Sequence, residues 1–186
     1  MTVDTIVTQG ALAQNCYIIS AEDLCIIIDP GAEPLNISSR IAGKKVMAIL
    51  LTHRHSDHIG ALPFLQKETL APVYEMSNLK EQNYSIGPFH FQVIFTKGHT
   101  EDSLTYYFEK EKMMFTGDFL FHGDVGRCDL EGGSWSKMQE SIHKIKCYPD
   151  DIKVYPGHEE ATTLGEEKKH NPYFKDRKIS HFLISC

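Results

Sequence analysis

The stretch Thr-His-Arg-His-Ser-Asp-His-Ile-Gly, residues 52–60, limits what this chain can fold into more than any other part of the sequence. It follows an apolar run at residues 46–51, which is typical of a buried strand. A strand delivers the residues that follow it into a loop, and a loop can turn several side chains toward one point. The stretch therefore predicts a functional site at the end of a central strand.

The residue types in this stretch indicate a metal site. His53 and His55 are two positions apart, so both imidazoles leave the same face of an extended backbone. Asp57 and His58 follow the turn and can face a second point nearby. Imidazole and carboxylate together are ligands of zinc, iron or manganese, and the thiolates of a structural zinc site are missing from the stretch. This spacing suits two adjacent ions better than one.

Length, charge and cysteine content exclude several classes of protein. A chain of 186 residues can bury one substantial core, so we expect a single domain over residues 1–186. No apolar run is long enough to span a membrane, and the N-terminus shows no secretory signal. The five cysteines are irregularly spaced, which indicates reduced thiols and a cytoplasmic protein. The net charge of −6 argues against a nucleic-acid partner.

The rest of the chain predicts alternating strands and helices. Residues 2–9, 15–20 and 24–28 read as an antiparallel meander that ends at Asp29, whose side chain either faces the metal site or only forms a turn. Ser134 is a good N-cap for a helix with Trp135, Met138, Ile142 and Ile145 on one face. Further strands are expected at residues 72–74, 89–95, 104–108, 112–115 and 152–155, and further helices at 33–42, 57–67 and 164–170.

Three more metal ligands are predicted downstream, each after a short β segment and a glycine. They are His99, Asp118 and His158. A glycine before a ligand lets the backbone turn tightly and bring the side chain close to an ion. One such pair is weak evidence, because a glycine after a strand is also an ordinary turn. All three together, each with a His or Asp, make a specific set.

These motifs resemble those of the metallo-β-lactamase superfamily. The similarity rests on the stretch at residues 52–60, Gly-His-Thr at 98–100, Thr-Gly-Asp at 116–118 and Pro-Gly-His at 156–158, and it runs from Asn15-Cys16-Tyr17 to Asn171-Pro172-Tyr173. Gly126-Arg127-Cys128-Asp129, Glu166-Glu167 and His170-Asn171-Pro172 are most similar to the glyoxalase II branch, the hydroxyacylglutathione hydrolases.

The resemblance implies an α+β fold, a four-layer αβ/βα sandwich with metals at one edge. It assigns one metal to His53, His55 and His99, the other to Asp57, His58 and His158, and the bridge between them to Asp118. Two such ions, most readily zinc but also iron or manganese, would activate a bridging hydroxide for thioester hydrolysis. Asp57 and Asp118 are the expected catalytic residues. Asp118 would bridge the two ions, and Asp57 would also orient the hydroxide.

The expected partner is a small-molecule substrate, a glutathione thioester such as S-lactoylglutathione. Tyr106 and Tyr107 follow His99 and are candidates to line the pocket, with core packing as the equal alternative. Arg127 is a candidate to bind a substrate carboxylate or to support the metal loop. Full-length enzymes of the branch add a basic helical segment. Here little follows Asn171, and the positive charges there are Lys175, Arg177 and Lys178.

Other functions compete with this interpretation. A persulfide dioxygenase of the same superfamily would bind a single iron at positions equivalent to His53, His99 and Asp118. The second set, Asp57, His58 and His158, would then hold no ion. β-Lactamases of this superfamily generally carry a cysteine where Asp118 stands. A nuclease would need an arm-like insertion and fits the acidic charge poorly. A purely structural metal domain would need closed coordination, whereas seven ligands for two ions leave room for water.

Overall fold

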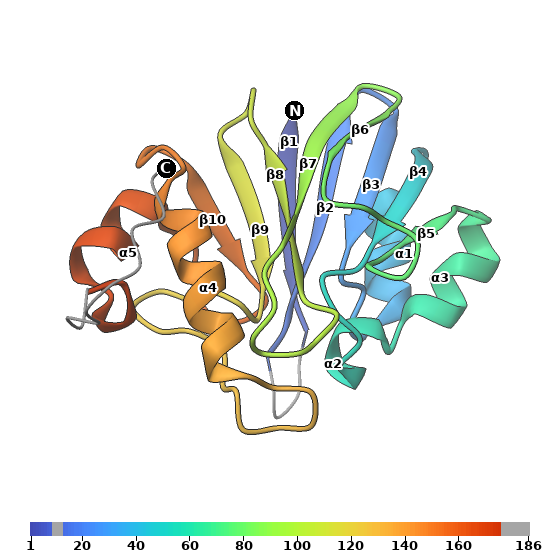
Figure 1. Ribbon diagram of the computed structural model, residues 1–186. Helices are drawn as coiled ribbons and strands as arrows, with labels where there is room; N and C mark the ends of the chain where they lie inside the picture. Colours follow the sequence, from blue (N-terminus) through green and yellow to red (C-terminus); the bar gives the residue numbers. More distant parts are fainter. Residues whose placement is uncertain (9–12, 176–186) are drawn as a thin grey trace.

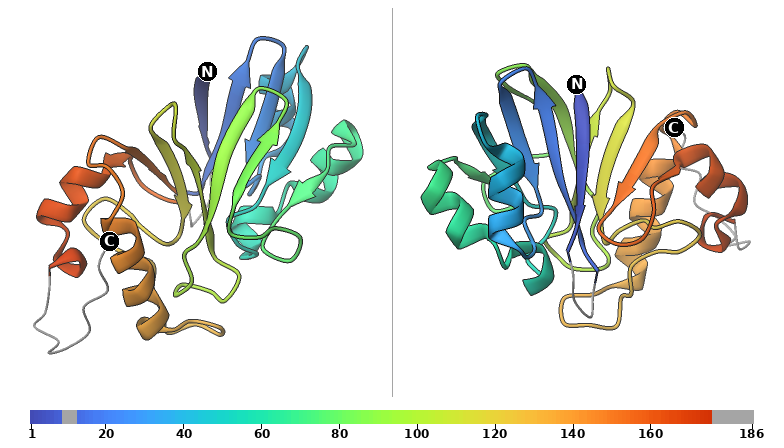
Figure 2. Two further views of the ribbon diagram at one scale, coloured as in Figure 1. Left: turned by 45° about the horizontal axis from the view of Figure 1, so that its top comes forward. Right: turned by 180° about the vertical axis from the view of Figure 1, so that it is seen from behind.

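Two β-sheets face each other and carry helices on their outer faces, as the computed structural model shows (Figure 1). The structure describes residues 1–8 and 13–175. The first sheet has the strand order β1-β2-β3-β4-β5, and the second has the order β11-β10-β9-β8-β7-β6. Helices α1, α2 and α3 lie on the side of the first sheet, and α4 and α5 cover the second (Figures 1 and 2). The predicted αβ/βα sandwich is confirmed.

The first sheet begins with the predicted meander. Strands β1 and β2 are antiparallel, as are β2 and β3, whereas β3 pairs parallel to β4 and β4 parallel to β5. Each parallel step is made through a helical crossover, which parallel pairing requires. The elements of this half are β1 (Thr2–Val7), β2 (Asn15–Ala21), β3 (Leu24–Ile28), α1 (Pro34–Ile41), β4 (Lys45–Leu50), α2 (Ser56–Ile59), α3 (Leu62–Thr69) and β5 (Val73–Tyr74).

The second sheet is antiparallel except where β10 pairs parallel to β9, on the return from helix α4. Ser134 caps α4 by accepting a hydrogen bond from the backbone N–H of Lys137, as the sequence predicts. The elements of this half are β6 (Asn83–Ile86), β7 (Phe89–Phe95), β8 (Leu104–Phe108), β9 (Met113–Gly117), α4 (Trp135–Lys146), β10 (Lys153–Pro156), β11 (Thr162–Thr163), α5 (Leu164–His170) and a 3-10 turn, η1 (Pro172–Phe174).

The inner strands of each sheet bury both of their faces. Ile26 and Ile28 of β3 pack between the sheets, against a group that includes Phe91 of β7, and Ile27 packs outward with Ile37 of α1. The outer face of the second sheet has its own core, which contains Met138, Ile142 and Ile145 of α4. Side chains alternate between faces along a strand, so a run of apolar residues serves two cores at once. Three apolar layers therefore hold four layers of secondary structure together.

Several local predictions need correction. The helix expected over residues 57–67 is two helices, α2 and α3, because Pro63 lies in the first turn of α3 and cannot continue a helix from α2. Strand β6 was not predicted, since residues 76–84 read as peripheral. Trp135 is 44% exposed and contacts Tyr173 instead of the core. Gln9, Arg177 and Lys178 belong to predictions that fall outside the described residues.

The cysteines follow the prediction of reduced thiols only in part. Cys16, Cys25 and Cys128 are free. Cys147 is disulfide-bonded, which corrects the prediction at that position, and Cys186 lies outside the described residues. Among the helices of residues 1–8 and 13–175, none has the length and apolar character needed to cross a membrane.

Candidate metal centre

All seven predicted ligands meet at one edge of the two sheets. Four of them follow β4, in the loop and helix α2 that lie at the lower edge of Figure 1. The other three follow β7, β9 and β10 of the second sheet. Their donor atoms fall into two groups, and within each group all atoms lie within 4.8 Å of one another. The groups are His53, His55, His99 and Asp118, and Asp57, His58 and His158.

The first group converges through three imidazole nitrogens. His55 Nδ1 lies 3.1 Å from His53 Nε2 and 2.9 Å from His99 Nε2. His99 Nε2 is also 3.5 Å from Asp118 Oδ2. Two histidines thus offer Nε2 and one offers Nδ1 to a common point, with a carboxylate oxygen beside it.

The second group also meets the Asp118 carboxylate. His58 Nε2 is 3.1 Å from Asp118 Oδ1, and His158 Nε2 is 3.5 Å from Asp118 Oδ2. Asp57 Oδ2 is 3.2 Å from His158 Nε2 and 3.8 Å from His58 Nε2. Asp118 therefore contacts histidines of both groups, which is the position required of a bridging ligand.

These residues fit divalent cations by their unsatisfied atoms as well as by their chemistry. His58 Nε2 and Asp118 Oδ1 are buried and lie 3.1 Å apart, but they form no hydrogen bond of good geometry with each other or with another described residue. Buried polar atoms are rarely left without such a bond, because that costs about 1–3 kcal/mol each. The two atoms lie where the two groups meet. A cation there would satisfy them.

The opposite nitrogen of most of these histidines is held by a hydrogen-bond partner. His99 Nδ1 is 2.8 Å from the carbonyl oxygen of Arg127, and His158 Nδ1 is 3.3 Å from that of Ala13. His53 Nδ1 is 3.1 Å from Thr52 Oγ1. A carbonyl partner requires the proton on Nδ1, which leaves Nε2 free as a metal ligand.

Asp29 joins this supporting shell, which the sequence left open between a turn and the metal site. Its carboxylate is buried and accepts hydrogen bonds from the backbone N–H and hydroxyl of Thr52, at 2.7 and 2.6 Å. Its Oδ2 also lies 3.0 Å from His58 Nδ1. One carboxylate thus positions His58 and the residue before His53. The sequence did not lead us to predict that the Thr52 hydroxyl links Asp29 to His53, although Thr52 directly precedes His53 in the motif.

Comparison with known proteins assigns the family. The profile described as "Metallo-beta-lactamase superfamily" matches residues 9–83 and 79–158, most of the chain. The chain belongs to the metallo-β-lactamase superfamily. It is 34% identical to the probable metallo-hydrolase YqgX of Bacillus subtilis (strain 168), over 88% of this chain and 93% of that protein. It is 30% identical to the hydroxyacylglutathione hydrolase GloC of Haemophilus influenzae, over 92% of this chain and 98% of that protein.

Solved structures of the superfamily superpose closely. BLEG-1, described as a B3 metallo-β-lactamase, gives a TM-score of 0.89 at 30% identity and covers 94% of this chain and 100% of its own. ETHE1 from Myxococcus xanthus gives 0.84 at 29% identity, over 92% and 84%. A di-iron-bound form of TTHA1623 gives 0.81 at 31% identity, over 90% and 98%. The chain is therefore a metal-dependent hydrolase by family, with relatives of differing activity.

Two glycines of this metallo-β-lactamase fold bring the ligands close together. A Cβ on Gly157 would lie 2.3 Å from Asp118 Oδ1 and 2.6 Å from the His58 ring. Gly117 has a φ of 53°, and a Cβ there would lie 2.2 Å from Thr52 Oγ1. Both contacts are far shorter than real Cβ contacts, so only glycine lets β9 and β10 end this close to the β4 loop.

Burial and charge shift the pKa values of the ligands in opposite directions. Burial lowers the pKa of His53 well below its ordinary value. Burial also opposes charge on His58, but the adjacent carboxylates of Asp118 and Asp29 outweigh it and raise its pKa to about 10. Burial alone would raise the pKa of Asp118, yet its contacts with His158 and His58 hold it well below the usual range. Without a cation, a proton on His58 therefore balances the Asp118 carboxylate.

The predicted substrate residues are not equally well placed. The hydroxyl of Tyr106 is buried, donates to the carbonyl oxygen of Leu51 at 2.8 Å and lies 3.2 Å from that of Tyr74, and Tyr107 packs against Tyr148. Both tyrosines serve the core, which was the alternative to pocket lining. The guanidinium of Arg127 is exposed and forms two hydrogen bonds with Asp129. Its backbone carbonyl supports His99, so the loop is buttressed by the main chain of Arg127.

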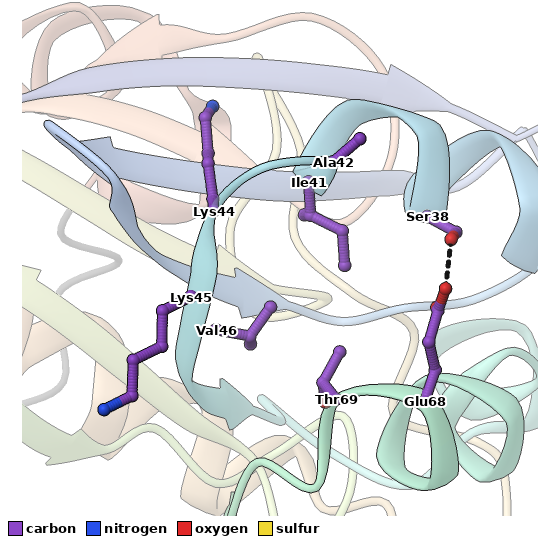
Figure 3. Close-up of a pocket in the computed structure, with 8 residues that line it drawn as sticks. All are labelled: Ser38, Ile41, Ala42, Lys44, Lys45, Val46, Glu68 and Thr69. Carbon is purple, nitrogen blue, oxygen red and sulfur yellow. Dashed lines mark hydrogen bonds between the residues drawn. The ribbon is translucent and has the colours of Figure 1, made fainter.

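A separate pocket of about 350 Å³ lies between α1, α3 and the start of β4 (Figure 3). Ser38 donates a hydrogen bond to Glu68 across it, and Lys44 and Lys45 are at its edge. It contains none of the seven candidate ligands and lies at the opposite end of β4 from His53. Two of the described histidines outside the two groups have other partners: His122 pairs with Glu160, and His90 contacts Ser85.

Proposed function

We propose that this protein hydrolyses thioesters of the hydroxyacylglutathione type with two divalent cations. The observation that carries the proposal is the position of Asp118, which contacts histidines of two complete ligand groups. Zinc is the expected metal, and iron or manganese would be accepted by the same His and Asp donors. The 30% identity to GloC, described as a hydroxyacylglutathione hydrolase, supports the choice of substrate class.

The side chains of this chain would share the work of hydrolysis. When bound, two divalent ions would lower the pKa of a shared water and polarise a carbonyl oxygen. Asp118 would hold the spacing of the two groups, because its carboxylate lies between them. Asp57 is partly exposed beside His158, so its carboxylate can accept a hydrogen bond from the attacking water and orient it toward the thioester carbon.

Arg127 is the proposed contact for the thiol part of the substrate. Its guanidinium is exposed and pairs with Asp129, and its own carbonyl oxygen holds His99. An exposed ion pair contributes little energy, so a substrate carboxylate can replace Asp129 at small cost. Glutathione carries two carboxylates, and one of them would bind here bidentately.

A persulfide dioxygenase with one iron is the second candidate, and the likeness to ETHE1 from Myxococcus xanthus favours it. In that case the first group would hold the only ion. The second group would then have no function, although His58 and Asp118 leave buried atoms unsatisfied on that side. We therefore rank hydrolysis first.

The test uses metal-free protein reloaded with zinc, iron or manganese. We expect S-lactoylglutathione to be hydrolysed, with bound metal approaching two ions per chain. Oxygen uptake with glutathione persulfide tests the dioxygenase, and a chromogenic cephalosporin tests β-lactam hydrolysis, in view of the likeness to BLEG-1. Oxygen uptake by the iron form with no thioester hydrolysis by any form would contradict the proposal.

A cytoplasmic location also stays a proposal. The free thiols of Cys16, Cys25 and Cys128 support it, and the disulfide bond of Cys147 argues against it.

A further inference from the structure

We propose that Asn15 is a positioning residue for His158 and that it sets the affinity of the second cation position. This inference rests on the proposed function, because it assumes that the group Asp57, His58 and His158 holds an ion. Asn15 is buried at the start of β2. Its side-chain amide donates to the carbonyl oxygen of Pro156 at 3.1 Å and to that of Glu159 at 2.8 Å. These two carbonyls lie on either side of His158 in the chain.

Three further contacts from the same stretch hold the His158 loop. The backbone N–H of Asn15 donates to the carbonyl oxygen of Gly157 at 2.8 Å. The Tyr17 hydroxyl donates to the carbonyl oxygen of Pro156 at 2.6 Å. His158 Nδ1 is 3.3 Å from the carbonyl oxygen of Ala13. The loop that carries His158 is thus fixed by the first strands of the chain, about 140 residues away in sequence.

This connection matters because the second group is divided between the two sheets. His158 follows β10 of the second sheet, whereas Asp57 and His58 follow β4 of the first. The sheets meet mainly through apolar side chains, and apolar contacts are not directional. A metal site needs its donors placed to within about 0.5 Å. The hydrogen bonds of Asn15 supply that precision at the edge where the donors meet.

The amide of Asn15 has no equivalent among other side chains of the same size. Both of its N–H groups face backbone carbonyl oxygens. In Asn15→Asp the shape is kept, but a carboxylate oxygen replaces the amide nitrogen and is repelled by both carbonyls. The loop would then shift together with His158. Neither of these hydrogen bonds involves a histidine of the first group. The affinity for the first ion should therefore be the same as in the wild type.

Loss of a supporting hydrogen-bond partner typically lowers metal affinity by about 10–100-fold. We expect that decrease for the second ion in Asn15→Asp, with the first ion unaffected. Tyr17→Phe removes only one hydrogen bond to the Pro156 carbonyl, so it should lower the affinity for the second ion less and leave the fold intact. Tyr148→Phe is the matched control, because it also removes one tyrosine hydroxyl hydrogen bond, to Gln92, and neither residue is among the seven candidate ligands.

The experiment measures metal binding without any substrate. Metal-free wild type and variants are titrated with Co²⁺, and the two binding steps are followed by visible absorption and by metal analysis after dialysis at fixed free Zn²⁺. The inference predicts two ions in wild type and Tyr148→Phe, and one ion at the same free Zn²⁺ in Asn15→Asp. Circular dichroism and the melting temperature of the metal-free proteins report on folding.

Three results would overturn the inference: two ions bound to folded Asn15→Asp with wild-type affinity, equal weakening of both steps, or a wild type that binds only one ion. If Asn15→Asp does not fold, Tyr17→Phe decides, and unchanged second-step affinity in it counts against the inference. Failure of the proposed function is a different result, since it would be a wild type with two bound ions that does not hydrolyse thioesters.

Discussion

The two sheets supply the candidate metal centre in different ways. The first sheet contributes four candidate ligands from six consecutive residues, 53–58, at the end of β4 and in α2. The second contributes His99, Asp118 and His158, each from the end of a different strand. A local turn can shape the first set, whereas only the completed fold brings the second set together. The contiguous half, residues 53–58, is therefore a local motif. The dispersed half, which is His99, Asp118 and His158, is brought together only by the tertiary structure.

The support of the two halves differs accordingly. In the contiguous half, one buried carboxylate, Asp29, serves both His58 and Thr52. In the dispersed half, main-chain carbonyls of Arg127 and Ala13 hold His99 and His158. A side-chain support can be removed by one substitution, whereas a carbonyl must be displaced through its neighbours. This difference leads to the following predictions.

The largest effect is expected from Asp118→Asn, which removes the contact shared by both halves. An amide keeps the shape but loses the negative charge that faces both groups. We expect turnover to fall by about 10²–10³-fold or more and both ions to bind more weakly. Thioester hydrolysis and metal analysis check this. Asp151→Asn, an exposed carboxylate paired with Lys112, is the control. Full activity of Asp118→Asn would break the comparison, because the halves would then not share a ligand.

Asp29→Asn should have the next largest effect and should act on the contiguous half. The amide cannot accept all the hydrogen bonds that Thr52 and His58 direct at this carboxylate. We expect metal affinity to fall by about 10–100-fold. Competition with a chromophoric chelator measures the change. A variant with unchanged affinity would show that the six-residue motif is shaped by its own turn alone.

Metal affinity should also depend on pH through His58. Without metal its pKa is raised to about 10, so the ring is charged at neutral pH and must lose a proton to bind a cation. Affinity should therefore fall by up to about tenfold for each pH unit lowered below that value. The stability of the metal-free protein should run the other way. The charged ring contributes stability below its unfolded pKa, and that contribution is lost as pH rises toward 10.

Calorimetry in buffers of different ionisation enthalpy counts the released protons, and melting curves of metal-free protein between pH 7 and pH 10 give the stability trend. If binding released no proton, or if the metal-free protein became more stable over this range, the charged His58 would be contradicted.

The smallest effect is expected from Tyr106→Phe, which tests whether this residue belongs to the core or to the substrate pocket. Its hydroxyl donates to the backbone carbonyl of Leu51 and lies close to that of Tyr74, so its loss should destabilise the fold by about 1–3 kcal/mol. Thioester hydrolysis below the melting temperature should keep its kcat and KM. Urea denaturation measures the loss of stability, and steady-state kinetics measure kcat and KM. A raised KM without loss of stability would return Tyr106 to the pocket.

The sequence alone predicted much of this molecule for identifiable reasons. Strands β2, β3, β4 and β7 were predicted because apolar runs and turn residues act locally, and so was the Ser134 cap of α4. The ligand candidates were visible because four of them are clustered after one strand and the other three each follow a strand and a glycine. The break between α2 and α3 was not predicted, since the effect of Pro63 depends on where the helix starts.

Contacts across the fold could not be read from the sequence. The hydrogen bonds from Asn15 and Tyr17 to the His158 loop join residues about 140 positions apart, and no local pattern marks them. The carbonyl of Arg127 was missed for a related reason, because a main-chain acceptor leaves no trace in residue type. Burial of Tyr106 and Tyr107 also depends on how β8 packs, which a short apolar strand does not specify.

The central claim is that the two halves meet to hold two cations. It is tested most directly by a crystal structure of the zinc-loaded protein with anomalous diffraction measured above and below the zinc edge. We expect two anomalous peaks, one among His53 Nε2, His55 Nδ1 and His99 Nε2, and one among Asp57, His58 Nε2 and His158 Nε2, with Asp118 between them. A single peak at saturating zinc, or peaks away from these atoms, would contradict it.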